Sequence, residues 1–182
     1  MIAELISVGT ELLLGNIVNT NAAYLSEKMA GLGISVYFET TVGDNEERLK
    51  IALESALSRS DLVILSGGLG PTSDDITKET AAKVLDLPLY EDSDVKAAIK
   101  GYFEKRKITN ITNNNWKQAI VPEGAKILFN PNGTAPGLIL TSKDGKKTVV
   151  LLPGPPGELK PLFEEQVIPY LEQINLHQQL HL

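Results

Sequence analysis

The feature that most constrains the fold is a repeated order of short apolar run, glycine-containing loop and amphipathic segment. Ile2 to Val8 and Asp61 to Ser66 are apolar runs of strand length, and each is followed at once by glycine. Between them, Ile34 to Thr41 is rich in β-forming residues. Continuous apolar strands joined by helices favour right-handed crossovers and a mostly parallel sheet that is covered on both faces.

Helical periodicity fills most of the connections between these strands. The segments with apolar residues at helical spacing are Asn19 to Leu32, Glu46 to Ser58, Asp75 to Leu87 and Ser93 to Lys107. Ser93 is expected to cap the last of these. The polar stretch from Ile108 to Lys117 predicts a loop and a short helix, which form a small subdomain or a partner contact. Within it, Trp116 either anchors an interface or packs against the domain's own core.

The last third of the chain predicts three short strands and a final helix. The strands are Lys126 to Phe129, Gly137 to Thr141 and Thr148 to Leu152, and Asp144 to Lys146 forms the turn of an antiparallel pair at one side of the sheet. The expected fold class is therefore a three-layer α/β/α domain with a mostly parallel sheet and a small β-hairpin extension. Residues 1–172 form this domain, and residues 173–182 are expected to be a tail.

Composition limits the chemistry that the chain can perform. Its 182 residues include no cysteine and two histidines, both within the last six positions. Catalysis is therefore expected to use carboxylates, hydroxyls, amides, lysine or metal. A net charge of −6 argues against a broad nucleic-acid surface, although a small anion held locally remains compatible with it. No long apolar run is present, and Glu4 stands where a signal peptide would be basic, so a cytoplasmic protein without membrane contact is expected.

The strongest motif is SGGLGPTSDDIT, from Ser66 to Thr77, between an apolar strand and a helix. Glycines let the backbone approach a ligand closely, and helix N-termini attract anions. Asp74 and Asp75 either cap the helix or bind a divalent cation beside phosphate. Lys78 either contacts a phosphate or lies solvated on the helix surface. The motif lacks the Gly-Lys-Ser/Thr end of a Walker A loop and is not GxGxxG.

Three further loops carry small residues at strand ends, and the single acid Asp44 follows another strand. Gly9-Thr10-Glu11 precedes Asn19 and Asn21, where Asn19 is either a helix cap or a ligand for base or ribose hydroxyls. Asp44 either caps a helix or positions metal or water. NPNGTAPG at 130–137 and PGPPGE at 153–158 are each typical turns. Four such loops at strand ends exceed what connection requires and predict a binding edge.

The sequence resembles the CinA (competence/damage-inducible protein A) family, whose N-terminal domain belongs to the molybdopterin-binding fold. The resemblance lies in four blocks in order: GTELLLGNIVNTNA, GGLGPTSDDIT, NPNGTAPG and LPGPPGEL. It implies a three-layer α/β fold and a metal-dependent pyrophosphatase that converts ADP-ribose to AMP and ribose 5-phosphate. It also implies roles for Asp75 and Asp44, and an acid at Glu79. Many members continue into a nicotinamide-nucleotide amidase domain, and because this sequence stops before such a domain, amidase activity is not expected of it.

Together these observations predict a metal-assisted attack of water on a bound pyrophosphate. Asp44, Asp75 and Lys78 are the expected catalytic residues, and Asp44, Asp74 and Asp75 the expected ligands of a divalent cation. Substrate-binding residues are expected in all four loops: Thr10, Glu11, Asn19, Asn21, Gly67, Gly68, Gly70, Thr72, Gly133, Thr134, Pro136 and Gly154. The expected partners are a small nucleotide substrate and further copies of the chain. The alternatives are a non-catalytic module that binds molybdopterin or a nucleotide, and a partner domain for a separate amidase.

Overall fold

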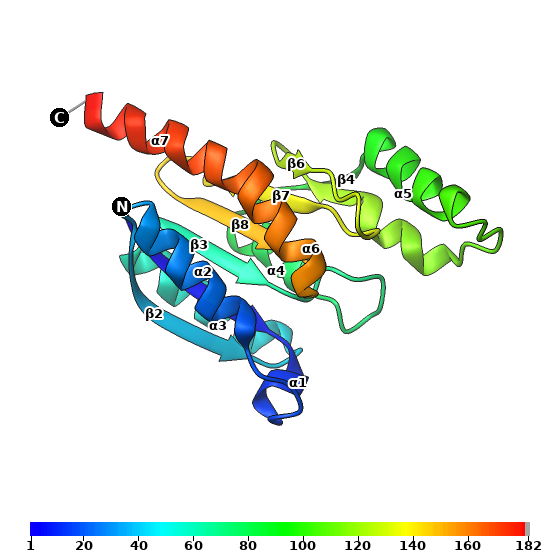
Figure 1. Cartoon of the computed structure of the whole chain (residues 1–182), viewed down its shortest axis with the longest axis horizontal. Coiled ribbons are helices and arrows are strands. Elements are labelled where there is room, and N and C mark those ends of the chain that lie inside the picture. The colour runs from blue at the N-terminus through cyan, green and yellow to red at the C-terminus, as the bar shows by residue number, and fades with distance from the viewer. Residues whose placement is uncertain (181–182) are drawn as a thin grey trace.

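The computed structural model describes residues 1–180 and is built on a six-stranded sheet with the order β2-β1-β3-β8-β7-β6 (Figure 1). The strands are β1 (Ile2–Val8), β2 (Ser35–Val42), β3 (Leu62–Ser66), β6 (Lys126–Leu128), β7 (Gly137–Thr141) and β8 (Thr148–Leu152). Strand β1 pairs in parallel with β2 and β3, and β3 pairs in parallel with β8. Strand β7 runs antiparallel to both β8 and β6. The predicted mostly parallel sheet with an antiparallel hairpin at one side is confirmed.

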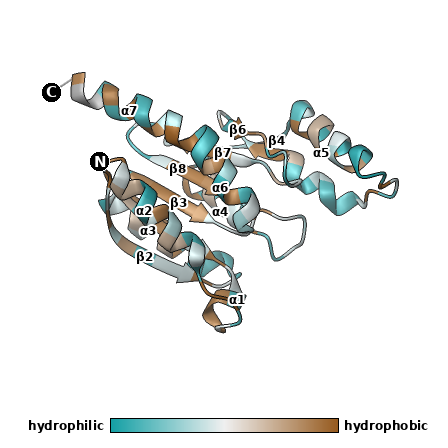
Figure 2. Ribbon diagram, viewed as in Figure 1, coloured by the Kyte–Doolittle hydropathy of each residue, from teal (hydrophilic) through white to brown (hydrophobic). Residues whose placement is uncertain are grey.

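Helices cover both faces of this sheet, because its central strands are apolar on both sides. One layer contains α2 (Thr20–Gly31), α6 (Pro156–Leu162), the π-helical turn η2 (Phe163–Val167) and α7 (Ile168–Leu180). The other contains α3 (Glu46–Arg59) and α4 (Thr77–Val84). Alternate residues of β3 face opposite layers. Ile64 packs in the apolar cluster beneath α2, α6 and α7, and Val63 and Leu65 pack in the cluster beneath α3 and α4. Brown ribbon on the central strands marks these apolar residues (Figure 2).

A small subdomain extends the second layer. It contains α5 (Ser93–Lys105), the 3₁₀ helix η1 (Asn113–Ala119) and a two-stranded sheet of β4 (Leu89–Glu91) and β5 (Ile120–Pro122), which pair antiparallel. Sequence periodicity did not predict β4 and β5, because three-residue strands are too short to show alternation. Trp116 packs against the core cluster, and Lys96 Nζ lies 5.5 Å from its ring centroid. Core packing of Trp116 is thus confirmed, and its use in an interface stays a prediction.

Two helix starts differ from those predicted. Helix α4 begins at Thr77 and not at Asp75, because Asp75 accepts hydrogen bonds from the Thr72 amide and hydroxyl and closes a turn. Of the two alternatives for Asp74 and Asp75, capping of this helix is therefore wrong. Helix α5 is capped by Asp92, which accepts from the amide of Val95, and not by Ser93.

The C-terminal helix differs from the expected tail. Helix α7 extends to Leu180, so residues 173–180 continue the helix, and residues 181 and 182 lie outside the described part of the chain. The side chains of Leu176 and Leu180 are 59% and 79% exposed. Among the described helices, none is both long and apolar enough to cross a bilayer.

Candidate functional site

Four parallel strands end together at one edge of the sheet, and a cleft of about 710 Å³ opens there. The Gly9 amide donates to Val42 O at 2.9 Å, and the Gly67 amide donates to Leu152 O at 2.9 Å. These bonds align the loops that follow β1, β2, β3 and β8. These loops and the 130–137 loop, which leads into β7, thus meet at the carboxyl edge, where α/β proteins usually bind ligands.

The loop after β3 requires glycine at two positions. Gly67 and Gly68 adopt φ values of 95° and 70°, in the left-handed region that other residues avoid. A Cβ on Gly67 would overlap the carbonyl oxygen of Val8, and one on Gly68 would overlap the Thr77 hydroxyl. That hydroxyl donates to Gly67 O at 2.8 Å and ties the loop to the first turn of α4. Glycine therefore lets the loop pass directly over the ends of β1 and α4.

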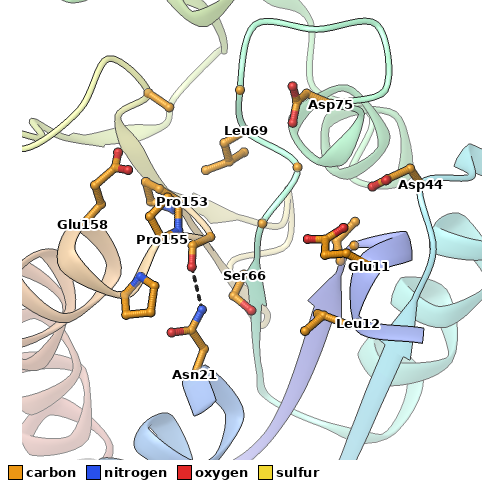
Figure 3. Close-up of a pocket in the computed structure, with 18 of the residues that line it drawn as sticks. Glu11, Leu12, Asn21, Asp44, Ser66, Leu69, Asp75, Pro153, Pro155 and Glu158 are labelled. Atoms are coloured by element: carbon orange, nitrogen blue, oxygen red, sulfur yellow. Dashed lines mark hydrogen bonds between the residues drawn. The ribbon is translucent and has the colours of Figure 1, made fainter. Parts of the chain in front are cut away.

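Carboxylates form the wall of the cleft beside this loop, as Figure 3 shows for Glu11, Asp44 and Asp75. The Asp75 carboxylate receives the Thr72 amide at 3.0 Å and the Thr72 hydroxyl at 2.7 Å. The Asp44 amide donates to the Thr10 hydroxyl at 3.0 Å, and Asn45, not Asp44, caps α3. Because Asp44 does not cap that helix, its exposed carboxylate is available to the cleft.

These carboxylates do not form a complete metal cage. Across residues 1–180, no three histidine or acidic side chains converge closely enough to hold an ion by themselves. The expected ligands Asp44, Asp74 and Asp75 all line the cleft, but they remain apart. Mg²⁺ commonly binds to one or two carboxylates together with substrate phosphates and water. The donor set fits a cation of this kind and does not fit one held only by protein.

Lys78 lies outside the cleft, contrary to its expected contact with a phosphate or with solvent. It is 6% exposed, and its ammonium donates to Lys117 O at 2.6 Å. Burial lowers the pKa of Lys78 to about 8, although Glu79, 3.8 Å away, opposes the shift. Lys117 in turn donates to the carbonyl oxygens of Thr72 and Asp75. These lysines therefore fasten η1 to α4 and to the back of the glycine loop.

Two asparagines at the start of α2 have different surroundings. Asn19 caps α2 by accepting from the Ala22 amide at 3.2 Å, and it donates to the Ser7 hydroxyl at 2.8 Å. The capping interpretation is confirmed. Asn21 donates to Gly154 O at 2.7 Å, whereas its buried Oδ1 receives no hydrogen bond from any residue that the structure describes. A buried acceptor without a hydrogen bond destabilises the protein, so a donor that bound Asn21 Oδ1 would be stabilising.

Glu158, which was not among the predicted site residues, lies on the opposite side of the cleft from Glu11 (Figure 3). Its Oε1 accepts from Asn130 Nδ2 at 2.8 Å, and burial raises the pKa of its carboxyl group. A Cβ on Gly133 would overlap the same oxygen, so this glycine makes room for Glu158. The signal in the sequence was its place directly after PGPPG, within the first turn of a helix.

Most of the expected binding residues do line the cleft. Those that line it are Glu11, Asn19, Asn21, Asp44, Gly67, Gly68, Gly70, Thr72, Asp74, Asp75, Thr134 and Gly154. Thr10, Lys78, Gly133 and Pro136 are not among its lining residues. Additional lining residues include Ser66, Gln118 and the apolar group Leu12, Ile17 and Val18. Gln118 accepts the Thr134 hydroxyl at 2.8 Å, and this bond joins the small subdomain to the loop before β7.

Comparison with known proteins places this domain in a family. A family model described as "Probable molybdopterin binding domain" matches residues 4–173. The crystal structure of CinA from Thermoplasma acidophilum is 40% identical, covers 90% of this chain and 95% of that one, and gives a TM-score of 0.82. The chain belongs to the CinA family. A molybdopterin biosynthesis protein from Mycobacterium abscessus covers 100% of this CinA-family domain and 98% of that chain, with 19% identity and a TM-score of 0.65, and it supports the fold alone.

Curated relatives extend well beyond the matched region. A "Putative competence-damage inducible protein" from Caldicellulosiruptor bescii is 59% identical over 96% of this chain and 42% of its own length. One with the same description from Thermoanaerobacter pseudethanolicus is 63% identical over 94% of this chain and 41% of its own length. This CinA-family domain therefore spans about two fifths of the length of these relatives.

Proposed function

We propose that the domain is a metal-dependent nucleotide pyrophosphatase that hydrolyses ADP-ribose to AMP and ribose 5-phosphate. The observation that carries this proposal is the meeting of the Gly67–Gly70 loop with Glu11, Asp44 and Asp75 in one cleft. Backbone amides of a glycine-rich loop suit phosphate oxygens, and carboxylates suit a divalent cation. Membership of the CinA family supports the same assignment.

Charge makes a cation necessary for this activity. A pyrophosphate on the glycine loop would lie beside several carboxylates, and like charges repel strongly where water is partly excluded. Asp75 and Asp44 are the residues that would hold a divalent cation, with Asp74 at the rim. When bound there, such a cation would supply positive charge to the pyrophosphate and would lower the pKa of a water molecule.

The chain's own residues orient and hold the substrate. Backbone amides of Gly68 to Gly70 hold phosphate oxygens, and Thr72 keeps the Asp75 carboxylate directed by donating two hydrogen bonds to it. Leu12, Ile17 and Val18 offer an apolar surface to the nucleoside base. No covalent intermediate on the protein is required, because water serves as the nucleophile.

Incubation of the metal-stripped domain with ADP-ribose tests the proposal directly. AMP is followed by chromatography with and without Mg²⁺ or Mn²⁺. The proposal expects AMP and ribose 5-phosphate in equal amounts, and only when the cation is present. Absence of AMP with every cation tried would remove the hydrolase assignment.

A non-catalytic binding module is the second candidate, and the match to a family model described as "Probable molybdopterin binding domain" favours it. Ligand binding to the native state raises its apparent stability. Protection from thermal unfolding by ADP-ribose or molybdopterin without metal, and without products, would support the module. A partner domain for a separate amidase remains a third candidate, since the curated relatives are longer. This candidate predicts that substitutions on the surface, and not those in the glycine loops, abolish binding to the amidase.

A further inference from the structure

The two sides of the cleft offer different chemistry. Backbone amides of the glycine loop and the carboxylates of Asp44 and Asp75 lie on one side. The opposite side carries the carboxylate of Glu158 and adjoins the 153–158 turn, where Asn21 binds Gly154 O (Figure 3). On that side the side-chain oxygens of Glu158 and Asn21 Oδ1 are acceptors, so the ligand group that matches them must donate hydrogen bonds.

The orientation of the Asn21 amide is fixed by its partner. Gly154 O can only accept, so the nitrogen of Asn21 must face it and the oxygen must be the atom without a partner. That oxygen is buried, and a donor that reached it would remove the cost of an unsatisfied acceptor. The carbonyl of Gly154 therefore fixes the side-chain amide of Asn21 so that its oxygen is the free acceptor at this end of the cleft.

Glu158 is held as a second acceptor in the same region. Asn130 binds one of its oxygens at 2.8 Å, and the absence of a side chain at Gly133 leaves space for that oxygen. Glu158 is partly buried, so its carboxylate is partly desolvated, and this burial raises the pKa of the carboxyl group. A desolvated carboxylate gains from hydroxyl donors and repels phosphate, so the pyrophosphate is directed to the glycine loop instead.

We infer that Glu158 and Asn21 form a subsite for the hydroxyl groups of a sugar, and that this subsite selects nucleoside diphosphates that carry a sugar beyond the pyrophosphate. The inference rests on the proposed function for the placement of the pyrophosphate. With the pyrophosphate on the glycine loop, the hydroxyls of a terminal sugar supply donors to both acceptors, whereas a nucleoside diphosphate that lacks this sugar and keeps its nucleoside on the other side supplies none there. Adenine is the rival ligand for this subsite, because its amino group also donates.

Calorimetry with non-hydrolysable analogues tests the subsite separately from turnover. The α,β-methylene analogues of ADP-ribose and ADP are titrated into the domain with Mg²⁺ present. A hydrogen bond to a charged group is worth about ten-fold or more in affinity, so the ADP-ribose analogue should bind about ten-fold more tightly. Glu158→Gln should remove that advantage and leave the affinity for the ADP analogue unchanged.

The control is Glu165→Gln, which makes the same change of charge at an exposed position on η2. It should keep the preference for the sugar-bearing analogue. If Glu158→Gln does not fold, Glu158→Asp shortens the side chain and should reduce the same preference.

Three results would overturn the subsite. Equal weakening of both analogues by Glu158→Gln would assign the residue to adenine or to the fold. If Glu158→Gln kept the preference for the ADP-ribose analogue, Glu158 would have no part in recognising the sugar. If the parent domain bound the two analogues equally, it would have no subsite that selects the terminal sugar. AMP release from ADP-ribose reports on the proposed function alone, so tight selective binding without AMP would retain the subsite and reject the hydrolase.

Discussion

The loop after β3 and the loop after β1 border the same cleft but are held in different ways. The first is tied by the Thr77 hydroxyl, by the contacts of Asp75 with Thr72, and by Lys117 from the small subdomain. The loop after β1 is tied near Thr10, which exchanges hydrogen bonds with Asp44. The tip that follows exposes Leu14 at 69% and Val18 at 82%.

Under the proposed function, this difference separates two tasks within one site. Phosphate binding depends on backbone donors that are already aimed at the anion, so the loop that carries them must be rigid. Binding of a base to an apolar surface depends on the area that is buried and not on exact orientation, so the loop that carries this surface can be less rigid. The comparison therefore predicts that substitutions in the loop after β3 are costly and that those at the tip after β1 are mild.

The largest expected effect is that of Gly67→Ala. The added methyl group would overlap Val8 O, and the φ of 95° is strained for alanine. We expect a loss of about 3 kcal/mol in the free energy of unfolding, measured in urea. Gly157→Ala is the control, since a Cβ there meets nothing within 4 Å. Equal losses in both variants would show that the tight passage over β1 is not a source of stability.

Asp75→Asn is expected to reduce turnover of ADP-ribose about 100-fold, or about 2.7 kcal/mol, because the amide is a poor ligand for a divalent cation. Its oxygen can still accept from Thr72, so the loop should stay folded. Asp94→Asn, at an exposed position on α5, is the matched control. Unchanged turnover in Asp75→Asn at saturating Mg²⁺ would remove Asp75 from the cation site.

Lys117→Met tests whether the small subdomain stiffens the glycine loop. The variant loses the donors to the carbonyl oxygens of Thr72 and Asp75. We expect KM for ADP-ribose to rise about ten-fold, because bonds from charged donors are worth about 1.5–3 kcal/mol. Lys100→Met, exposed on α5, should leave KM unchanged. A fall in thermal stability without any change in KM would mean that Lys117 supports only the fold.

The buried Lys78 is expected to make the free energy of unfolding depend on pH. Its pKa of about 8 in the folded state lies below its ordinary value of 10.5, so the unfolded state binds the extra proton between these values. Stability should therefore rise as pH increases through 8. Relative to Lys78→Met, the wild-type domain should gain about 1 kcal/mol between about pH 7.5 and 9. A constant difference across this window would contradict the lowered pKa.

The smallest effect is expected at the tip after β1. Val18→Ser should change KM by less than about three-fold and stability by less than about 0.5 kcal/mol, as for other exposed positions. A loss as large as that of Gly67→Ala would show that the tip is as firmly structured as the loop after β3, and the comparison would fail. Urea unfolding and steady-state kinetics measure both quantities.

The sheet was predictable because its information is local. Continuous apolar runs such as Leu62–Ser66 carry their own signal, and each helix between strands shows a regular period. The start of α4 was not predictable from the sequence, because two acidic residues before a helical pattern resemble N-terminal caps. Only the folded loop shows that Asp75 bonds to Thr72 instead. The short strands β4 and β5 are stabilised by each other and carry no local signal.

The candidate site was predictable as a set of loops but not as a set of contacts. Glycine clusters at strand ends indicated the cleft, because parallel strands end at a common edge. Lys78 looked available beside the glycine motif, and only tertiary packing shows that η1 buries it. Glu158 was missed because its environment comes from Asn130 and Gly133, which are distant in sequence.

The most direct test of this account is a crystal structure of the domain with Mg²⁺ and the α,β-methylene analogue of ADP-ribose. We expect the pyrophosphate to lie on the amides of Gly68 to Gly70, with Asp75 among the residues that hold the cation. We also expect hydroxyls of the terminal sugar to donate to Glu158 and to Asn21 Oδ1. A pyrophosphate bound away from the glycine loop, or a terminal sugar on the side of Leu12 and Val18, would contradict this account.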